Sequence, residues 1–161
     1  MKTDSGSFFV DANVLVYAAI ADDPRHKAAK DLLMDPGGTL HISPQIITEF
    51  YSTITSPKRV AAPYPPLEAI EFLETLLGYE HVSVLPITAA ASVRLLELLR
   101  DREVKGPQVF DLQIAATMLA HGVTRLFTYN GSDFKQIPDL EVLEPTDGGK
   151  PIEEEGSEFK T

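Results

Sequence analysis

Short apolar runs alternate with longer segments of helical character along this chain. The apolar runs predict five β-strands, at residues 8–10, 40–42, 82–85, 125–128 and 140–143. The segments between them predict helices at residues 13–20, 24–34, 44–55, 67–77, 89–100 and 109–121. This alternation predicts a three-layer α/β/α sandwich around a mainly parallel sheet, with helices on both faces.

Local signals mark the ends of several predicted helices. Asp23-Pro24 and Ser43-Pro44 each combine a capping residue with a proline at the first helical position, and Gly122 ends the last helix. After Pro145 the sequence becomes rich in Gly and Glu. We therefore expect one domain over residues 1–146 and a disordered acidic tail over residues 147–161.

Composition narrows the class of protein. The 161 residues include no cysteine, which excludes a disulfide framework, thiolate metal sites and cysteine nucleophiles. The apolar runs are too short to cross a bilayer, and the N-terminus is a poor signal peptide, so we expect a soluble, cytoplasmic protein. The formal net charge is −10. Either the partner is not a polyanion, or acids are gathered where a cation neutralises them.

Polar residues follow the first and fourth predicted strands. Ligands of open parallel sheets bind beyond the carboxyl ends of the strands, where the strand order reverses. Asp11 follows the first strand directly, and residues 128–133 follow the fourth. Asp11 also fits the N-cap of a helix, and Asp133 also fits an ordinary turn. Asn130 can supply a carbonyl oxygen at the same edge.

Two more acids lie in predicted helices. Glu49 falls about 130° from the centre of its helix's apolar face, so it points to the flank of the helix or to solvent. Asp111 lies in a helix that is apolar nearly all round, where an ionised carboxylate is costly without partners. It is either an N-cap or a buried acid that a cation keeps charged.

Taken together, these acids indicate a metal site. Three or four carboxylates in one cleft repel one another unless a cation is present. Oxygen ligands in a chain without cysteine favour Mg²⁺ or Mn²⁺. Zinc is not indicated, because the spacing of the four histidines suggests no paired ligands.

Four segments, in order, resemble the motifs of PIN-domain nucleases, and most of all VapC-type toxins of bacterial toxin–antitoxin pairs. They are Phe9-Val10-Asp11-Ala12-Asn13-Val14-Leu15, Thr48-Glu49-Phe50, Val109-Phe110-Asp111-Leu112-Gln113-Ile114-Ala115-Ala116 and Leu126-Phe127-Thr128-Tyr129-Asn130-Gly131-Ser132-Asp133-Phe134. The resemblance extends over about residues 8–145. It implies a five-stranded parallel sheet in the order 3-2-1-4-5 and Mg²⁺- or Mn²⁺-dependent hydrolysis of RNA phosphodiester bonds. It also implies an antitoxin partner and a homodimer.

The resemblance also implies roles for individual residues. The acids that match the motifs would bind the metal directly or through water, and one of them, such as Glu49, would accept a proton from the attacking water. These acids are Asp11, Glu49, Asp111 and Asp133. Thr128 and Asn130 would orient the ligands or the substrate. Some relatives carry an acid where this chain has Asn130, so either Asn130 or Asp133 occupies the fourth position.

RNA binding also requires basic groups for the phosphates. Lys58, Arg59, Arg102 and Lys105 lie in loops near the predicted cleft, where they either contact RNA or serve solubility. Two other functions remain open. A haloacid-dehalogenase-like phosphohydrolase also has an aspartate after its first strand, but it needs a second one two residues later, where this chain has Asn13. The other alternative is a non-catalytic PIN-fold interaction module.

Overall fold

Five parallel strands form one sheet in the computed structural model, which describes residues 6–146. The strands are β1 (Ser7–Val10), β2 (Thr39–Ile42), β3 (Val82–Val84), β4 (Arg125–Phe127) and β5 (Glu141–Leu143). Their order is β3-β2-β1-β4-β5, and every neighbouring pair is parallel. The predicted fold class and strand order are therefore confirmed. The predicted disordered tail lies outside the described residues.

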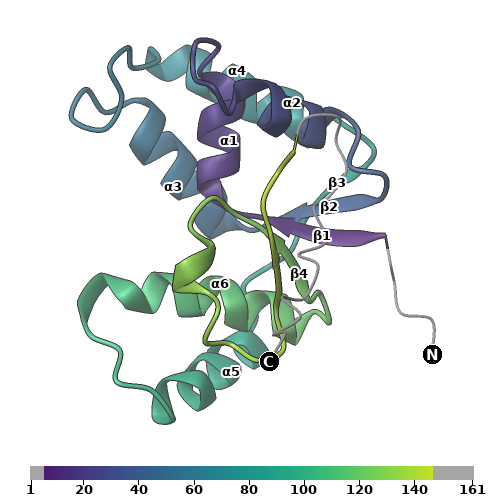
Figure 1. Cartoon of the computed structure of the whole chain (residues 1–161), viewed down its shortest axis with the longest axis vertical. Helices are drawn as coiled ribbons and strands as arrows, with labels where there is room; N and C mark the ends of the chain where they lie inside the picture. The colour runs from purple at the N-terminus through teal and green to yellow at the C-terminus, as the bar shows by residue number, and fades with distance from the viewer. Residues whose placement is uncertain (1–5, 147–161) are drawn as a thin grey trace, which may run out of the picture.

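Helices cover both faces of this sheet. They are α1 (Ala12–Ala19), α2 (His26–Met34), α3 (Pro44–Ile54), α4 (Pro66–Leu77), α5 (Ala89–Arg100) and α6 (Val109–Ala120), with 3₁₀ turns η1 (Gly106–Gln108) and η2 (Gly131–Asp133). In Figure 1, α1 to α4 lie on one face of the sheet, and α5 and α6 lie on the other. The three layers of the sandwich are therefore two helical layers with the sheet between them. No helix within residues 6–146 is both long enough and apolar enough to span a membrane.

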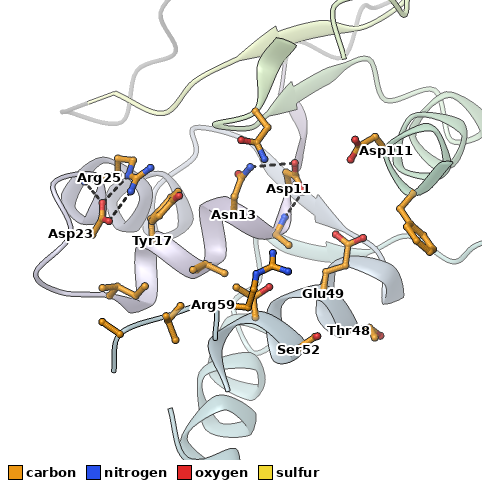
Figure 2. Close-up of a pocket in the computed structure, with 18 residues that line it drawn as sticks. Asp11, Asn13, Tyr17, Asp23, Arg25, Thr48, Glu49, Ser52, Arg59 and Asp111 are labelled. Carbon is orange, nitrogen blue, oxygen red and sulfur yellow. Dashed lines mark hydrogen bonds and ion pairs between the residues drawn. The ribbon is translucent and has the colours of Figure 1, made fainter. Parts of the chain in front are cut away.

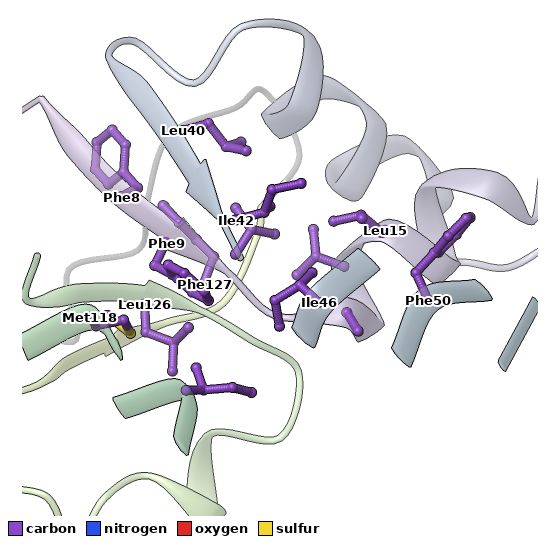
Figure 3. Close-up of a cluster of buried hydrophobic side chains, with 14 of the residues drawn as sticks. Phe8, Phe9, Leu15, Leu40, Ile42, Ile46, Phe50, Met118, Leu126 and Phe127 are labelled. Carbon is purple, nitrogen blue, oxygen red and sulfur yellow. The ribbon is translucent and has the colours of Figure 1, made fainter. Parts of the chain in front are cut away.

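The central strand is buried because both helical layers cover it. The side chains of Phe8, Phe9 and Val10 on β1 are almost completely removed from solvent. Figure 3 shows how the layers meet there, with Ile46 on the α3 side and Met118 on the α6 side. Full burial of a side chain of this size stabilises the fold by about 1.5–3 kcal/mol. The end of β1 is therefore one of the most firmly held parts of the backbone.

The order of the strands reverses beside β1. The chain runs outward from β1 to β2 and β3, and then returns through α5 and α6 to form β4 on the other side of β1. The register pairs Val10 with Phe127, and the Asp11 N–H donates to the Phe127 carbonyl at 3.0 Å. Asp11 and Thr128, the residues that follow these two strands, are thus held side by side at the position where such sheets bind ligands.

Helix α2 begins at His26, so the prediction that Pro24 occupies its first position was wrong. The Asp23 carboxylate accepts the Arg25 backbone N–H at 2.8 Å, and the Asp23 carbonyl accepts the His26 N–H at 3.0 Å. These bonds form a turn ahead of the helix, which delays its start. Ser43 is the N-cap of α3 as predicted, although its hydroxyl makes no capping hydrogen bond. Gly122 follows α6 with a φ of +71°, which favours glycine.

Candidate functional site

Asp11 occupies the junction between β1 and α1, where it is the N-cap residue of the helix. Only 7% of the residue is exposed. Its Oδ1 accepts the Ala12 N–H at 2.7 Å, and its Oδ2 accepts the Thr128 hydroxyl at 2.8 Å. Burial raises the pKa of Asp11 above its ordinary value, although both hydrogen bonds oppose this effect. The carboxylate is therefore both a helix cap and a buried charge with few neighbours to stabilise it.

A small polar network holds Asp11 from the other side. The Asn13 amide donates to the Thr128 hydroxyl at 3.1 Å and lies 3.4 Å from Asp11 Oδ2, while its own oxygen accepts the Tyr129 N–H at 3.2 Å. The Thr128 oxygen also accepts the Asn130 N–H at 3.0 Å. The Thr128 hydroxyl therefore lies between the Asp11 carboxylate and the Asn130 backbone. The site analysis of the sequence missed Asn13, although a polar residue two positions after Asp11 was a visible signal.

Glu49 and Asp111 come from the opposing helices α3 and α6. Burial and the charge of Asp11 raise the pKa of Glu49. Burial raises the pKa of Asp111 to about 6, with further contributions from Asp11, Asp133 and Glu49. These shifts have a common cause, because carboxylates in a partly desolvated cleft disfavour one another's ionised form. A nearby positive charge would therefore stabilise the ionised forms of these acids.

Gln45 joins these two helices. Its amide nitrogen donates to Glu49 Oε1 at 3.0 Å and to the Phe110 carbonyl at 2.8 Å. Phe110 directly precedes Asp111 in the first turn of α6. One side chain therefore links Glu49 on α3 to the segment that carries Asp111.

Three of the predicted acids line one cleft of about 840 Å³. Figure 2 shows Asp11, Glu49 and Asp111 on three different elements around this cleft, which Asn130 also lines. We refer to it as the main cleft. Asp133 lies in a second cleft of about 490 Å³, on the other side of Asp111, which lines both. Asp133 thus contributes its charge to the acid cluster without facing the main cleft.

The four basic candidates are divided among different places. Arg59 lines the main cleft, and Arg102 lines the second cleft, where its guanidinium donates to the Leu98 and Gln136 carbonyls, both at 3.0 Å. Lys58 and Lys105 are exposed and line neither cleft. The main cleft also contains Arg25, which sequence analysis did not select.

The donor set suits a divalent cation. Carboxylate and amide oxygens are the ligands that Mg²⁺ and Mn²⁺ prefer, and the raised pKa values of the acids show that their charges are poorly compensated. Within residues 6–146, no three His, Asp or Glu side chains form a group placed to hold one ion. An ion shared by these acids would therefore bind in one of three ways: to fewer than three side chains directly, through bridging water, or after side chains rotate.

Comparison with known proteins identifies the family. The model of the PIN domain matches residues 8–140. The chain belongs to the PIN domain family. Ribonuclease VapC24 of Mycobacterium tuberculosis is 26% identical over 138 residues, covering 84% of this chain and 94% of that protein. Ribonuclease VapC48 of the same organism is 25% identical over 142 residues, covering 86% of this chain and 97% of that protein.

Solved structures share this PIN fold at lower sequence identity. VapBC2 from Rickettsia felis, bound to a DNA fragment from its promoter, aligns with a TM-score of 0.62 and 20% identity, covering 87% of this chain and 99% of that chain. VapBC-1 from nontypeable Haemophilus influenzae aligns with a TM-score of 0.60 and 21% identity, covering 86% and 97%. At this level of identity, the likeness supports the fold of the PIN domain.

We predict that Thr128→Val destabilises the PIN domain by about 1–3 kcal/mol, because it leaves the buried Asp11 carboxylate and the Asn130 N–H without the hydroxyl that they share. The free energy of unfolding in urea measures this loss. Thr124→Val, at an exposed position just before β4, is the matched control and should change stability by less than about 0.5 kcal/mol. Equal stability of the two variants would contradict a structural role for the Thr128 hydroxyl.

We predict that Asp111→Asn stabilises the metal-free protein at neutral pH. Because the pKa of Asp111 is raised to about 6, the folded protein binds this proton more tightly than the unfolded chain does. The wild type therefore loses stability as the pH rises from about 4 to about 6, whereas the variant lacks this loss.

Thermal unfolding between pH 4 and pH 7, with a chelator present, measures this difference. The advantage of Asp111→Asn should grow up to about pH 6 and then level off at a few degrees at most, since solvent screens a half-buried charge. Asp35→Asn, at an exposed acid, is the control and should follow the wild type. A difference that is constant across this pH range would contradict the assignment.

Proposed function

We propose that this PIN domain is a divalent-metal-dependent ribonuclease, the toxin of a type II toxin–antitoxin system. The convergence of Asp11, Glu49 and Asp111 on the main cleft carries the proposal, because these acids come from three separate elements and have pKa values raised by burial and, for Glu49 and Asp111, by the charge of Asp11. The names of the curated relatives, which are ribonucleases, support the same reaction. RNA is therefore the proposed substrate and Mg²⁺ or Mn²⁺ the proposed cofactor.

The chemistry follows from the acids that line the cleft. A bound divalent ion lowers the pKa of water and neutralises charge on a phosphodiester. Asp11, Glu49 and Asp111 would hold the ion, directly or through water. Asn130 would offer a further oxygen atom in the main cleft, and Asp133 would add negative charge from the second cleft. Glu49 is half-buried with a raised pKa, which suits it to accept the proton of the attacking water.

Two side chains have supporting roles in this proposal. Thr128 and Asn13 keep the Asp11 carboxylate in one orientation. Arg59 is an exposed cation that lines the same cleft, and it would contact a phosphate of the RNA. Asn13 also argues against a haloacid-dehalogenase-like reaction, because its amide is committed to Asp11, Thr128 and Tyr129 where that reaction needs a second acid.

The proposed partners are an antitoxin and a second copy of the chain. Two of the similar solved structures are VapBC structures, and another is a toxin–antitoxin complex from Klebsiella pneumoniae, which supports an antitoxin partner. Val93 and Leu96 on α5, and Leu67 on α4, are exposed apolar side chains that a partner could cover. With RNA as its substrate, the protein would act in the cytoplasm.

Cleavage of a panel of RNAs tests the proposed reaction. The wild type should cleave at least one RNA with Mg²⁺ or Mn²⁺ and none with a chelator. Asp11→Asn and Asp111→Asn should each lower the rate at least about hundredfold, because each removes a carboxylate proposed to bind the metal. The control is Asp35→Asn, which alters an exposed acid outside both clefts and should retain full activity. Undiminished cleavage by Asp11→Asn would exclude this mechanism.

Expression in bacteria tests the proposed toxin. Induction of the wild-type chain should arrest growth, whereas Asp11→Asn at an equal protein level should not. We expect a small antitoxin reading frame next to this gene. Its co-expression should restore growth, and its product should co-purify with the chain. Cells that grow normally although their extracts contain enough of the chain to degrade RNA would contradict the toxin assignment but not the ribonuclease activity.

A further inference from the structure

One face of α1 forms a wall of the main cleft. Asn13, Val16, Tyr17 and Ile20 all line it, and their spacing of three, four and seven residues places them on one side of a helix. Tyr17 lies six residues beyond the N-cap Asp11, which is about 9 Å along the helix axis. Figure 2 shows the cleft continuing from Asp11 past Asn13 and Tyr17 toward Asp23 and Arg25. The cleft therefore extends well beyond the acids.

The guanidinium of Arg25 is held rigidly at this far end. Its carbon lies over the Tyr17 ring, 3.6 Å from the centroid, which is a cation–π contact. Asp23 accepts both Nε–H and Nη2–H of Arg25, each at 2.8 Å. A two-point carboxylate pair of this kind fixes the plane of the guanidinium as well as its position.

The Tyr17 ring is itself anchored to the edge of the sheet. The ring of Tyr129 meets it edge to face, with centroids 5.1 Å apart. Tyr129 follows β4, and its N–H is bonded to Asn13 within the network that holds Asp11. The position of Arg25 is thus coupled to that of the acids through two aromatic rings.

This arrangement leaves a flat surface for a ligand. The guanidinium carbon lies over the Tyr17 ring, yet 46% of the Arg25 side chain remains exposed. Asp23 takes two of its five N–H groups and neutralises its charge, so the group is poorly suited to be a phosphate anchor. A fixed guanidinium plane is well suited to stack on a nucleobase.

We propose that Tyr17, Asp23 and Arg25 form a subsite that stacks one unpaired nucleobase of the RNA strand, away from the phosphodiester that is cut. This inference rests on the proposed ribonuclease function and deepens it. The Arg25 guanidinium would stack on the base. Asp23 fixes the orientation of that guanidinium through two hydrogen bonds, and the Tyr17 ring packs against it. The subsite would hold the strand at a second point and so contribute to substrate selection.

A purely structural role for Arg25 predicts a different result from base stacking. If Arg25 only fastened the loop before α2, its replacement would change affinity for every RNA alike. If it stacks on a base, its replacement should matter only when that base is present. Removing single bases from the RNA therefore separates the two roles.

The test measures binding of a single-stranded RNA that the wild type cleaves, in the inactive Asp11→Asn background so that the RNA stays intact. Each position of the RNA is replaced in turn by an abasic nucleotide. Binding is compared for Asp11→Asn alone, with Arg25→Lys, which keeps the charge without the plane, and with Arg94→Lys as the control. Arg94 is a partly exposed arginine on α5 that also pairs with acids, Glu97 and Asp139. Arg25→Gln replaces Arg25→Lys if the latter does not fold.

We expect one abasic position to weaken binding about tenfold in the Asp11→Asn protein and in the Arg94→Lys control, and to have almost no effect with Arg25→Lys. If the wild type cleaves RNA but the Arg25 variant responds to every abasic position as the control does, the stacking subsite is excluded and the ribonuclease stands. If the wild type cleaves no RNA of the panel, both the ribonuclease and the subsite are excluded.

Discussion

The burial of one carboxyl group constrains the rest of this molecule. The Asp11 carboxylate lies at the end of the most buried strand, where the loss of water raises its pKa. An isolated buried charge is costly, and the fold offsets that cost with hydrogen bonds from Ala12 and Thr128. The Thr128 hydroxyl is in place only when β1 and β4 are paired in register. The site is therefore tied to correct assembly of the sheet.

The topology brings the other acids to the same place. Because α5 and α6 carry the chain across the second face of the sheet, the start of α6 arrives opposite α3, and Gln45 bonds across the gap. Acids that are distant in sequence thereby interact through space, and this interaction adds to the effect of burial in raising the pKa values of Glu49 and Asp111. Like charges that repel one another in this way are typical of sites organised around a cation. A positive charge in the main cleft would stabilise the ionised forms of these acids.

The strongly acidic composition is compatible with an RNA substrate, because RNA would contact the side chains that line the main cleft and not the molecule's net charge. Arg59 and Arg25 both line the main cleft, but they are chemically different. Arg59 is an exposed cation, whereas Arg25 is neutralised by Asp23 and held in one orientation by it. One is suited to a phosphate and the other to a base. Recognition in this cleft therefore need not depend on overall positive charge.

The sequence by itself determined the fold class, the approximate helices and strands, and three acids that line the main cleft, because these depend on hydrophobic periodicity and on short motifs that occur in a fixed order. Only the tertiary structure decided which loop residues join them. It placed Arg59 in the cleft and Lys58 outside it, Asn130 in the main cleft and Asp133 in the next, and it delayed the start of α2 to His26. The physical reason is that side chains in loops and turns are oriented by contacts between segments distant in sequence, which no local pattern encodes.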